Sequence, residues 1–188
     1  MPFVYDLPAI NALRQGEILS PVTLHRPIMP SAPLGEGAEA RVITVVHNRM
    51  VVLHSDCDLE QDFNYRASIG SDAVDESNGR VVSEVLLCDL FAESEIRSQI
   101  AGNDIWRRII QNQNERYHQL PQACISDSAQ QLPQLFLDFK RCFMERTPSL
   151  YSAIQTSAIL RLAIIPDVYI HDLIQRFFSY HARVGLPN

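Results

Sequence analysis

The sequence has no long apolar run and no cationic leader, and each absence excludes a class of protein. No stretch reaches the roughly 18 apolar residues of a membrane span, because the longest apolar tract, around residues 158–165, is interrupted by Arg161. The N-terminal residues lack the cationic region and apolar run of a secretory signal. We therefore expect a cytoplasmic protein with no membrane contact.

Close cysteine pairs are also missing. Cys57, Cys88, Cys124 and Cys142 are widely spaced, with no C-x-x-C pair and no matching H-x-x-x-H. This spacing fits neither a zinc ribbon nor a secreted disulfide framework. The sequence predicts reduced thiols, no cofactor and no metal.

Several enzyme signatures are absent as well. The chain has no glycine-rich phosphate loop, no G-x-S-x-G elbow, no H-E-x-x-H and no dinucleotide fingerprint. Its net charge of −6 argues against a surface that follows a phosphate backbone throughout, although a local basic patch is compatible with it. RNA is therefore a less expected partner than another protein.

What is present indicates one globular unit. The 188 residues are 46% hydrophobic and 20% charged, which predicts a single domain over 1–188 with a compact core. Residues 1–90 look mainly β-rich and residues 91–188 helical and mixed. We expect an α+β fold: a small bent antiparallel sheet or SH3-like barrel with C-terminal helices.

In the β-rich half, apolar blocks at 42–46 and 50–53 flank His47-Asn48-Arg49 and predict a tight hairpin. The four prolines and two glycines between residues 21 and 37 predict a long loop. A further β-rich run is expected over 80–87.

The second half predicts helices and short strands. Helical spacing covers 93–100 and 104–114, and residues 117–121 and 135–139 look extended. Residues 148–165 predict one helix that ends before Pro166.

A last helix is expected over 167–183. Its apolar residues recur at helical spacing and form one broad face: Ile170, Leu173, Ile174, Phe177 and Phe178. Gly185 and Pro187 would end this helix.

The most unusual segment is 54–62, where an imidazole, a thiol and four carboxylates follow an apolar strand. Its candidate catalytic residues are His54, Asp56, Cys57 and Asp58. On an extended chain His54 and Cys57 face opposite sides, whereas His54, Asp56 and Asp58 share a face and suit a metal. Alternatively, Cys57 is a small buried residue and the acids bind backbone N–H groups. These interpretations stay open.

Two basic clusters are further candidates. Trp106, Arg107, Arg108 and Arg116 mix planar and cationic side chains as nucleic-acid surfaces do, although the pattern is more typical of a solvated helix face with Trp106 packed inward. Arg176, Phe177 and Arg183 on the last helix are candidates for binding a partner. Helix-dipole complementarity also explains the charge at the helix end.

Parts of the chain resemble an uncharacterised group of small bacterial proteins. The shared features are a strand that runs into an S-x-D-C-D-like segment at 51–58, here S-D-C-D, the block at 136–143, and Q-R-F-x-x-Y-x-x-R-V-G-L-P at 175–187. This resemblance implies no activity.

A second resemblance covers residues 15–53. The Q-G-E-I-L segment at 15–19, followed by the 41–53 strands, is similar to the start of the PemK/MazF-like small barrel of toxin endoribonucleases. The resemblance implies a catalytic arginine at Arg41, with His54 or Asp56 as its acid–base partner. It requires Arg41 to lie close to the strand end at His54.

The first functional hypothesis is a non-enzymatic bacterial accessory or regulatory protein that binds another protein. It is based on the amphipathic last helix, the missing catalytic motifs and the net acidity. The alternatives are a PemK/MazF-like RNA-cleaving enzyme and a metal-binding protein that uses residues 54–58.

Overall fold

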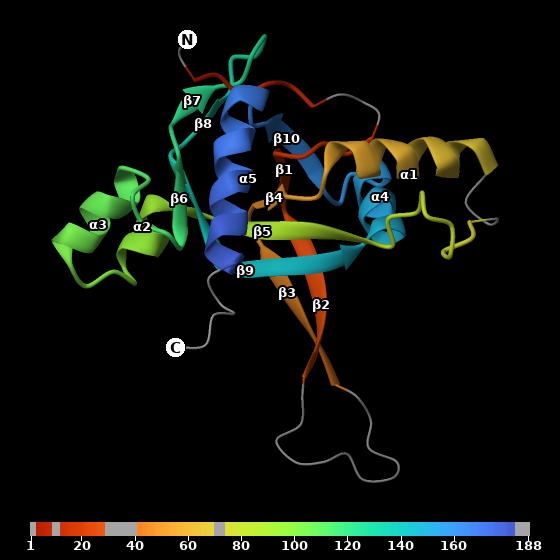
Figure 1. The fold of residues 1–188 in the computed structure, drawn as a ribbon, viewed down its shortest axis with the longest axis horizontal. Helices are drawn as coiled ribbons and strands as arrows, with labels where there is room; N and C mark the ends of the chain where they lie inside the picture. The colour runs from red at the N-terminus through yellow and green to blue at the C-terminus, as the bar shows by residue number, and fades with distance from the viewer. Residues whose placement is uncertain (1–2, 9–11, 29–40, 70–73, 183–188) are drawn as a thin grey trace.

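The structure is a computed structural model that describes all residues except 1–2, 9–11, 29–40, 70–73 and 183–188. Its centre is a curled antiparallel sheet of six strands in the order β10-β1-β4-β5-β9-β6 (Figure 1). These strands are β1 (Glu17–Ser20), β4 (Met50–Val52), β5 (Glu84–Ala92), β6 (Tyr117–Leu120), β9 (Leu135–Arg146) and β10 (Leu160–Ile164). The bent antiparallel sheet and the expected α+β class are confirmed.

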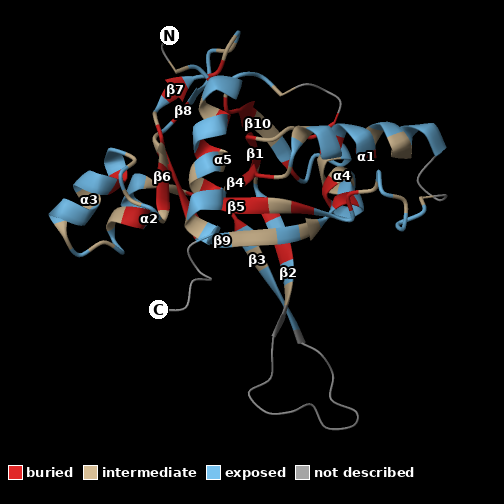
Figure 2. Cartoon of the chain, viewed as in Figure 1, coloured by how far each residue is buried: buried red, intermediate tan, exposed pale blue. Residues whose placement is uncertain are grey.

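One face of the sheet is covered by α5 (Asp167–Ala182), which crosses the strands in Figure 1. Ile170, Leu173 and Phe177 of this helix join the core with side chains from the central strands, including Leu137 and Phe139. The outer side of α5 is exposed in Figure 2. The last helix is therefore confirmed, and it buries most of its apolar face against its own sheet, whereas Phe178 of the expected face is exposed.

Four other helices of the described chain, α1 to α4, complete the core. On the second face, α1 (Asp56–Ile69) and α4 (Thr147–Gln155) contribute Leu59 and Leu150 to a cluster with β1, β4 and β5. At the β6 end, α2 (Glu93–Arg97) and α3 (Asn103–Ile110) pack on the sheet. No helix in the described part of the chain is long and apolar enough to cross a membrane.

A two-stranded arm projects from the sheet (Figure 1). It consists of β2 (Val22–Ile28) and β3 (Arg41–His47), which pair only with each other. Val22 lies opposite His47 at the base, and Ile28 lies opposite Arg41 at the outer end. A smaller pair, β7 (Ala123–Cys124) and β8 (Gln131–Leu132), lies beside β6.

Two expectations for this region are wrong. The blocks at 42–46 and 50–53 do not form a hairpin, because β3 pairs with β2 whereas β4 pairs with β1 and β5. Part of the expected proline-rich loop is strand β2. Pro27 is tolerated there because each arm strand has one open edge, where a missing N–H costs no ladder bond. Residues 29–37 of that loop lie outside the described residues.

The single helix expected over 148–165 is also wrong. Helix α4 ends at Gln155, Ser157 adopts a left-handed φ of 58°, and β10 then pairs with β1 at the edge of the sheet. Arg161 on β10 ion-pairs with Glu17, which is fully buried on β1. This buried pair favours the strand over a continued helix, because the Glu17 carboxylate needs a cation beside it.

Candidate functional site

The central strands β5 and β9 are irregular at one point. Cys88 lies opposite Cys142 and Leu90 lies opposite Leu137, so the single residue Asp89 faces the four residues 138–141. Such bulges interrupt the ladder and re-aim side chains, and they are frequent beside active sites. The bulge here places charged groups in the middle of an apolar sheet.

Asp89 holds the imidazole of His47, which stands at the base of the arm. Its Oδ1 hydrogen-bonds His47 Nδ1, and its Oδ2 accepts from Arg141 Nε at 2.9 Å. Arg26 on the neighbouring arm strand donates to His47 Nε2 at 2.9 Å. Because Arg26 can only donate, Nε2 is the acceptor and the proton lies on Nδ1. The result is a neutral, carboxylate-oriented imidazole.

Two guanidinium groups of this network stack on aromatic rings. The Arg26 guanidinium lies 3.7 Å from the Phe143 ring centroid, and that of Arg141 lies 4.9 Å from the Phe91 centroid. Both arginines keep exposure to solvent, since Arg26 is half-buried and Arg141 is exposed. Each ring therefore orients a guanidinium while leaving donors for a ligand.

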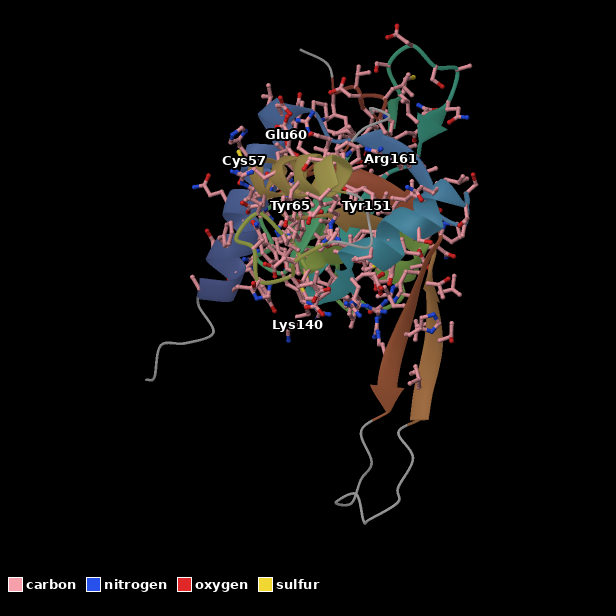
Figure 3. The ribbon with its side chains drawn as sticks, turned by 90° about the vertical axis from the view of Figure 1, so that its right-hand side faces the viewer. Cys57, Glu60, Tyr65, Lys140, Tyr151 and Arg161 are labelled. Atoms are coloured by element: carbon pink, nitrogen blue, oxygen red, sulfur yellow. The ribbon has the colours of Figure 1, made fainter. Side chains whose placement is uncertain are left out.

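A third arginine follows directly on the arm. The Arg49 carbonyl accepts from the Leu90 N–H at 3.0 Å, which places this residue beside the bulge. Its buried Nε has no hydrogen-bond partner within the described residues. Lys140, the chain's one lysine, is exposed on the bulge and is labelled at the lower edge of Figure 3.

We call this group the sheet-bulge site. It comprises Arg26, His47, Arg49, Asp89 and Arg141. Arg141 binds the Asp89 carboxylate, Arg26 binds His47, and the Arg49 backbone is held beside the bulge. The site thus has three arginines to one carboxylate, in a chain of net charge −6. An oriented imidazole can act as a general base, and arginines bind phosphate oxygens and stabilise developing negative charge.

A helix begins within the expected site at 54–62 and separates its side chains. The strand predicted to continue there ends at Val52 and α1 begins at Asp56, so His54, Asp56 and Asp58 do not share a strand face. No group of three His, Cys, Asp or Glu side chains in the described ranges can hold a metal ion. The metal-binding geometry proposed for this segment is therefore wrong.

Two acids of α1, Asp56 in its first turn and Asp62 further along, bind backbone and arginine groups instead. Asp56 accepts from the Gln15 N–H at 2.5 Å and from Arg14 at 2.7 Å. The fully buried Asp62 accepts from the Val82 N–H at 2.9 Å and from Arg66 at 2.8 Å. These bonds agree with the structural interpretation of the acids.

Cys57 and His54 line different cavities. Cys57 is exposed, so the alternative that it is a small buried residue is wrong. With Glu60, which Figure 3 also labels on α1, it borders a cavity of about 410 Å³. His54 and Asp58 border a separate cavity of about 310 Å³ beside Arg80. Partial burial lowers the pKa of His54.

Arg41 lies far from these residues. It pairs with Ile28 at the outer end of the arm, six residues from His47, which is about 20 Å along an extended strand. Its side chain lies outside the described residues. Since the arm leads away from α1 (Figure 1), the proximity of Arg41 to His54 that the PemK/MazF-like resemblance requires is not seen in the backbone.

The candidate nucleic-acid residues are only partly brought together. The Trp106 ring packs 5.3 Å from the Phe136 ring, in agreement with the inward-packed alternative, while Arg107 and Arg108 are exposed on α3. Arg116 donates two hydrogen bonds, of 2.7 and 2.5 Å, to the buried Asp138 of the bulge.

The candidate partner-binding residues are engaged within the chain. Arg176 donates to the carbonyl groups of Asn112, Asn114 and Tyr117, and so joins α5 to the start of β6 and to the segment before it. Phe177 is 8% exposed in the core. Arg183, Gly185 and Pro187 lie outside the described residues.

Sequence reasoning missed all five residues of the sheet-bulge site. Arg26 and His47 come from the arm, Arg49 is the second residue after it, and the other two lie on β5 and β9, which are distant in sequence. The available signal was a charged residue inside an apolar strand pattern, which both Asp89 and Arg141 present. Comparison with family models, curated proteins and solved structures finds no match to this chain.

Proposed function

We propose that the protein binds single-stranded RNA at the sheet-bulge site and cleaves it with His47 as general base. The observation that carries this proposal is the buried hydrogen bond from His47 to Asp89, with arginines on both sides of the pair. The proposal keeps the RNA-cleaving hypothesis but moves its chemistry from Arg41, His54 and Asp56 to a different set of residues.

The chemistry requires a nucleophile that no side chain of the site provides. The ribose 2′-OH supplies it, and this group distinguishes RNA from DNA. His47 Nε2 takes the 2′-OH proton, the 2′ oxygen bonds to phosphorus, and the bond from phosphorus to the 5′ oxygen breaks. The products are a 2′,3′-cyclic phosphate and a 5′-hydroxyl that takes a proton from water. Asp89 stabilises the imidazolium that forms.

Arg26 controls access to the base. Its guanidinium occupies the Nε2 lone pair of His47 in the free protein. A phosphate oxygen competes for this guanidinium with a full negative charge, and charge-assisted hydrogen bonds are about twice as strong as neutral ones. Substrate binding therefore withdraws Arg26 from Nε2 and leaves the base free next to the 2′-OH.

The direct test is a cleavage assay on an end-labelled single-stranded RNA of mixed sequence. We expect His47→Gln and Asp89→Asn each to reduce the cleavage rate by roughly 10²–10⁴-fold, the usual contribution of general base catalysis. His25→Gln is the matched control, since His25 is an exposed arm histidine outside the site.

A loss of RNA cleavage that comes from the site can be distinguished from a loss that comes from unfolding. Arg26→Gln removes a half-buried surface arginine and should weaken RNA binding without unfolding the chain, as circular dichroism would check. RNA cleavage at the wild-type rate by folded His47→Gln would exclude His47 as the base.

A second candidate function is protein binding by the arm, in line with the accessory hypothesis. Val42, Ile43 and Val46 are 59%, 44% and 60% exposed on a ribbon with two open edges. Open edges and exposed β-branched residues favour addition of a partner strand. We expect Val42→Lys/Val46→Lys to lose a partner that co-purifies with the wild type, while Asp89→Asn retains it. Equal recovery with both variants would contradict this candidate.

A further inference from the structure

A pair of thiols lies behind the sheet-bulge site. Cys88 and Cys142 are register partners across β5 and β9, at the last regular pair before the bulge. Directly opposed residues in antiparallel strands have Cα atoms about 4.5–5.5 Å apart, within the roughly 4.4–6.8 Å that disulfides span. No backbone movement is needed to bring these two residues into bonding range.

The two sulfur atoms also point to the same part of the bulge, at the carbonyl groups of residues 138 and 139. Cys88 Sγ donates to the Asp138 carbonyl at 3.4 Å, and Cys142 Sγ donates to the Phe139 carbonyl at 3.5 Å. These carbonyls are neighbours on the bulge. Both side chains join the core cluster beneath α5, on the sheet face opposite the Asp89–His47 pair, since strand residues alternate in direction.

The two thiols differ in exposure. Cys88 is fully buried, whereas Cys142 is half-buried. Burial raises the pKa of the Cys88 thiol, and the neighbouring Cys142 raises it further. An external reagent therefore reaches Cys142 first, and Cys88 stands behind it as the thiol that resolves the adduct.

We propose that Cys88 and Cys142 form a redox-active dithiol that closes to a reversible disulfide, with a low-molecular-weight disulfide such as oxidised glutathione as oxidant. The Cys142 thiolate attacks one sulfur of glutathione disulfide, its S–S bond breaks, and one glutathione leaves and takes up a proton. The Cys88 thiolate then attacks Cys142 Sγ and releases the second glutathione. Two protein thiols are oxidised and one glutathione disulfide is reduced to two thiols.

The position of the pair links this chemistry to the bulge. Cys88 directly precedes Asp89, and Cys142 directly follows Arg141. Arg141 donates a hydrogen bond to Asp89 on the other face of the sheet. A covalent bond between the two strands fixes the edge of the bulge from which both charged side chains project. The dithiol stands on its own geometry and does not depend on RNA cleavage.

The test uses a Cys57→Ser/Cys124→Ser protein, which lacks the two exposed thiols. The folded protein is treated with oxidised glutathione, quenched in acid, alkylated under denaturing conditions and weighed intact. We expect both thiols to be lost without added glutathione mass, and recovered after dithiothreitol. Trypsin should release peptide 81–97 joined to peptide 142–146, which contain one cysteine each.

A resolving-thiol variant separates the two steps. Cys88→Ala in the same background should stop at one stable glutathione on Cys142. A stable glutathione adduct in the protein that retains both thiols would overturn the proposal, because it would show that Cys88 does not resolve it. Retention of both free thiols, under conditions that modify Cys57 of the wild type, would overturn it as well.

Discussion

Among single residues, His118 on β6 has the most perturbed imidazole in the described part of the chain. It is 4% exposed and its Nδ1 has no hydrogen-bond partner among the described residues. Burial, reinforced by the charge of Arg176, lowers the pKa of His118 from 6.5 to about 3. The folded protein thus keeps this side chain neutral where an unfolded chain would protonate it.

The sign of the pH dependence follows from this difference. Between pH 6.5 and about 3 the unfolded state binds a proton that the folded state does not. The free energy of unfolding should therefore fall as the pH is lowered through this range, by up to about 1.4 kcal/mol per pH unit. Urea unfolding at pH 7.0 and 5.0 should show this loss in the wild type and a smaller loss in His118→Gln. His171→Gln, at an exposed position, is the control, and an unchanged loss in His118→Gln would contradict the assignment.

Gly16 lies at the turn before β1, where the backbone geometry requires a glycine. Its φ is 82°, and an added Cβ would lie 2.9 Å from Ile170 Cδ1 and 3.3 Å from Ile165 Cβ. We expect Gly16→Ala to lower the free energy of unfolding by about 3 kcal/mol, from left-handed strain and overpacking together. Gly79→Ala meets nothing within 4 Å and should change it by less than about 0.5 kcal/mol. Equal denaturation midpoints for the two variants would refute this account.

Among the elements, α5 shows most clearly how one helix stabilises the sheet. Phe177 is 8% exposed and packs edge-on against Phe139, whereas its neighbour Phe178 is 65% exposed. Phe177→Ala should cost about 3–5 kcal/mol in the free energy of unfolding. Phe178→Ala should cost under about 1 kcal/mol, and similar losses in both would mean that α5 does not cover the sheet as described.

The elements also differ in how far sequence could predict them. Helix α5 was predictable because its apolar spacing is local and regular. Helix α1 was not, since only Leu59 and Asp62 of it are buried and its sequence lacks an apolar stripe. The partners of β3 and β4 were not predictable either, because alternation marks a strand but does not say which strand lies beside it.

On the scale of the whole molecule, the fold class follows from composition and pattern, while the site depends on tertiary structure. His47 and Asp89 meet only because the arm base and the β5 bulge adjoin, and a register shift of this kind has no local sequence signature. The same arrangement concentrates positive charge at one place on a protein of net charge −6. The net charge of the whole chain therefore does not reveal this local concentration of arginines.

This local charge gives a prediction for the intact protein. Lys140 is the chain's one lysine and is exposed on the bulge. The rate at which an amine-specific reagent acetylates this side chain therefore measures the accessibility of the bulge surface. Single-stranded RNA should slow acetylation of Lys140 at least fivefold at low salt, and the protection should disappear as salt is raised. In Arg26→Gln/Arg141→Gln the RNA should give no protection. Protection of equal size in this variant would place the RNA elsewhere.

The central claim, that His47 activates a ribose 2′-OH, is tested most directly by analysing the cleavage products of one RNA and its 2′-deoxy analogue. The protein is incubated with each oligonucleotide, and the new ends are identified by mass spectrometry. The account predicts 2′,3′-cyclic phosphate ends from the RNA and an intact deoxy analogue. Cleavage of both oligonucleotides, or of neither at protein concentrations that saturate binding, would contradict it.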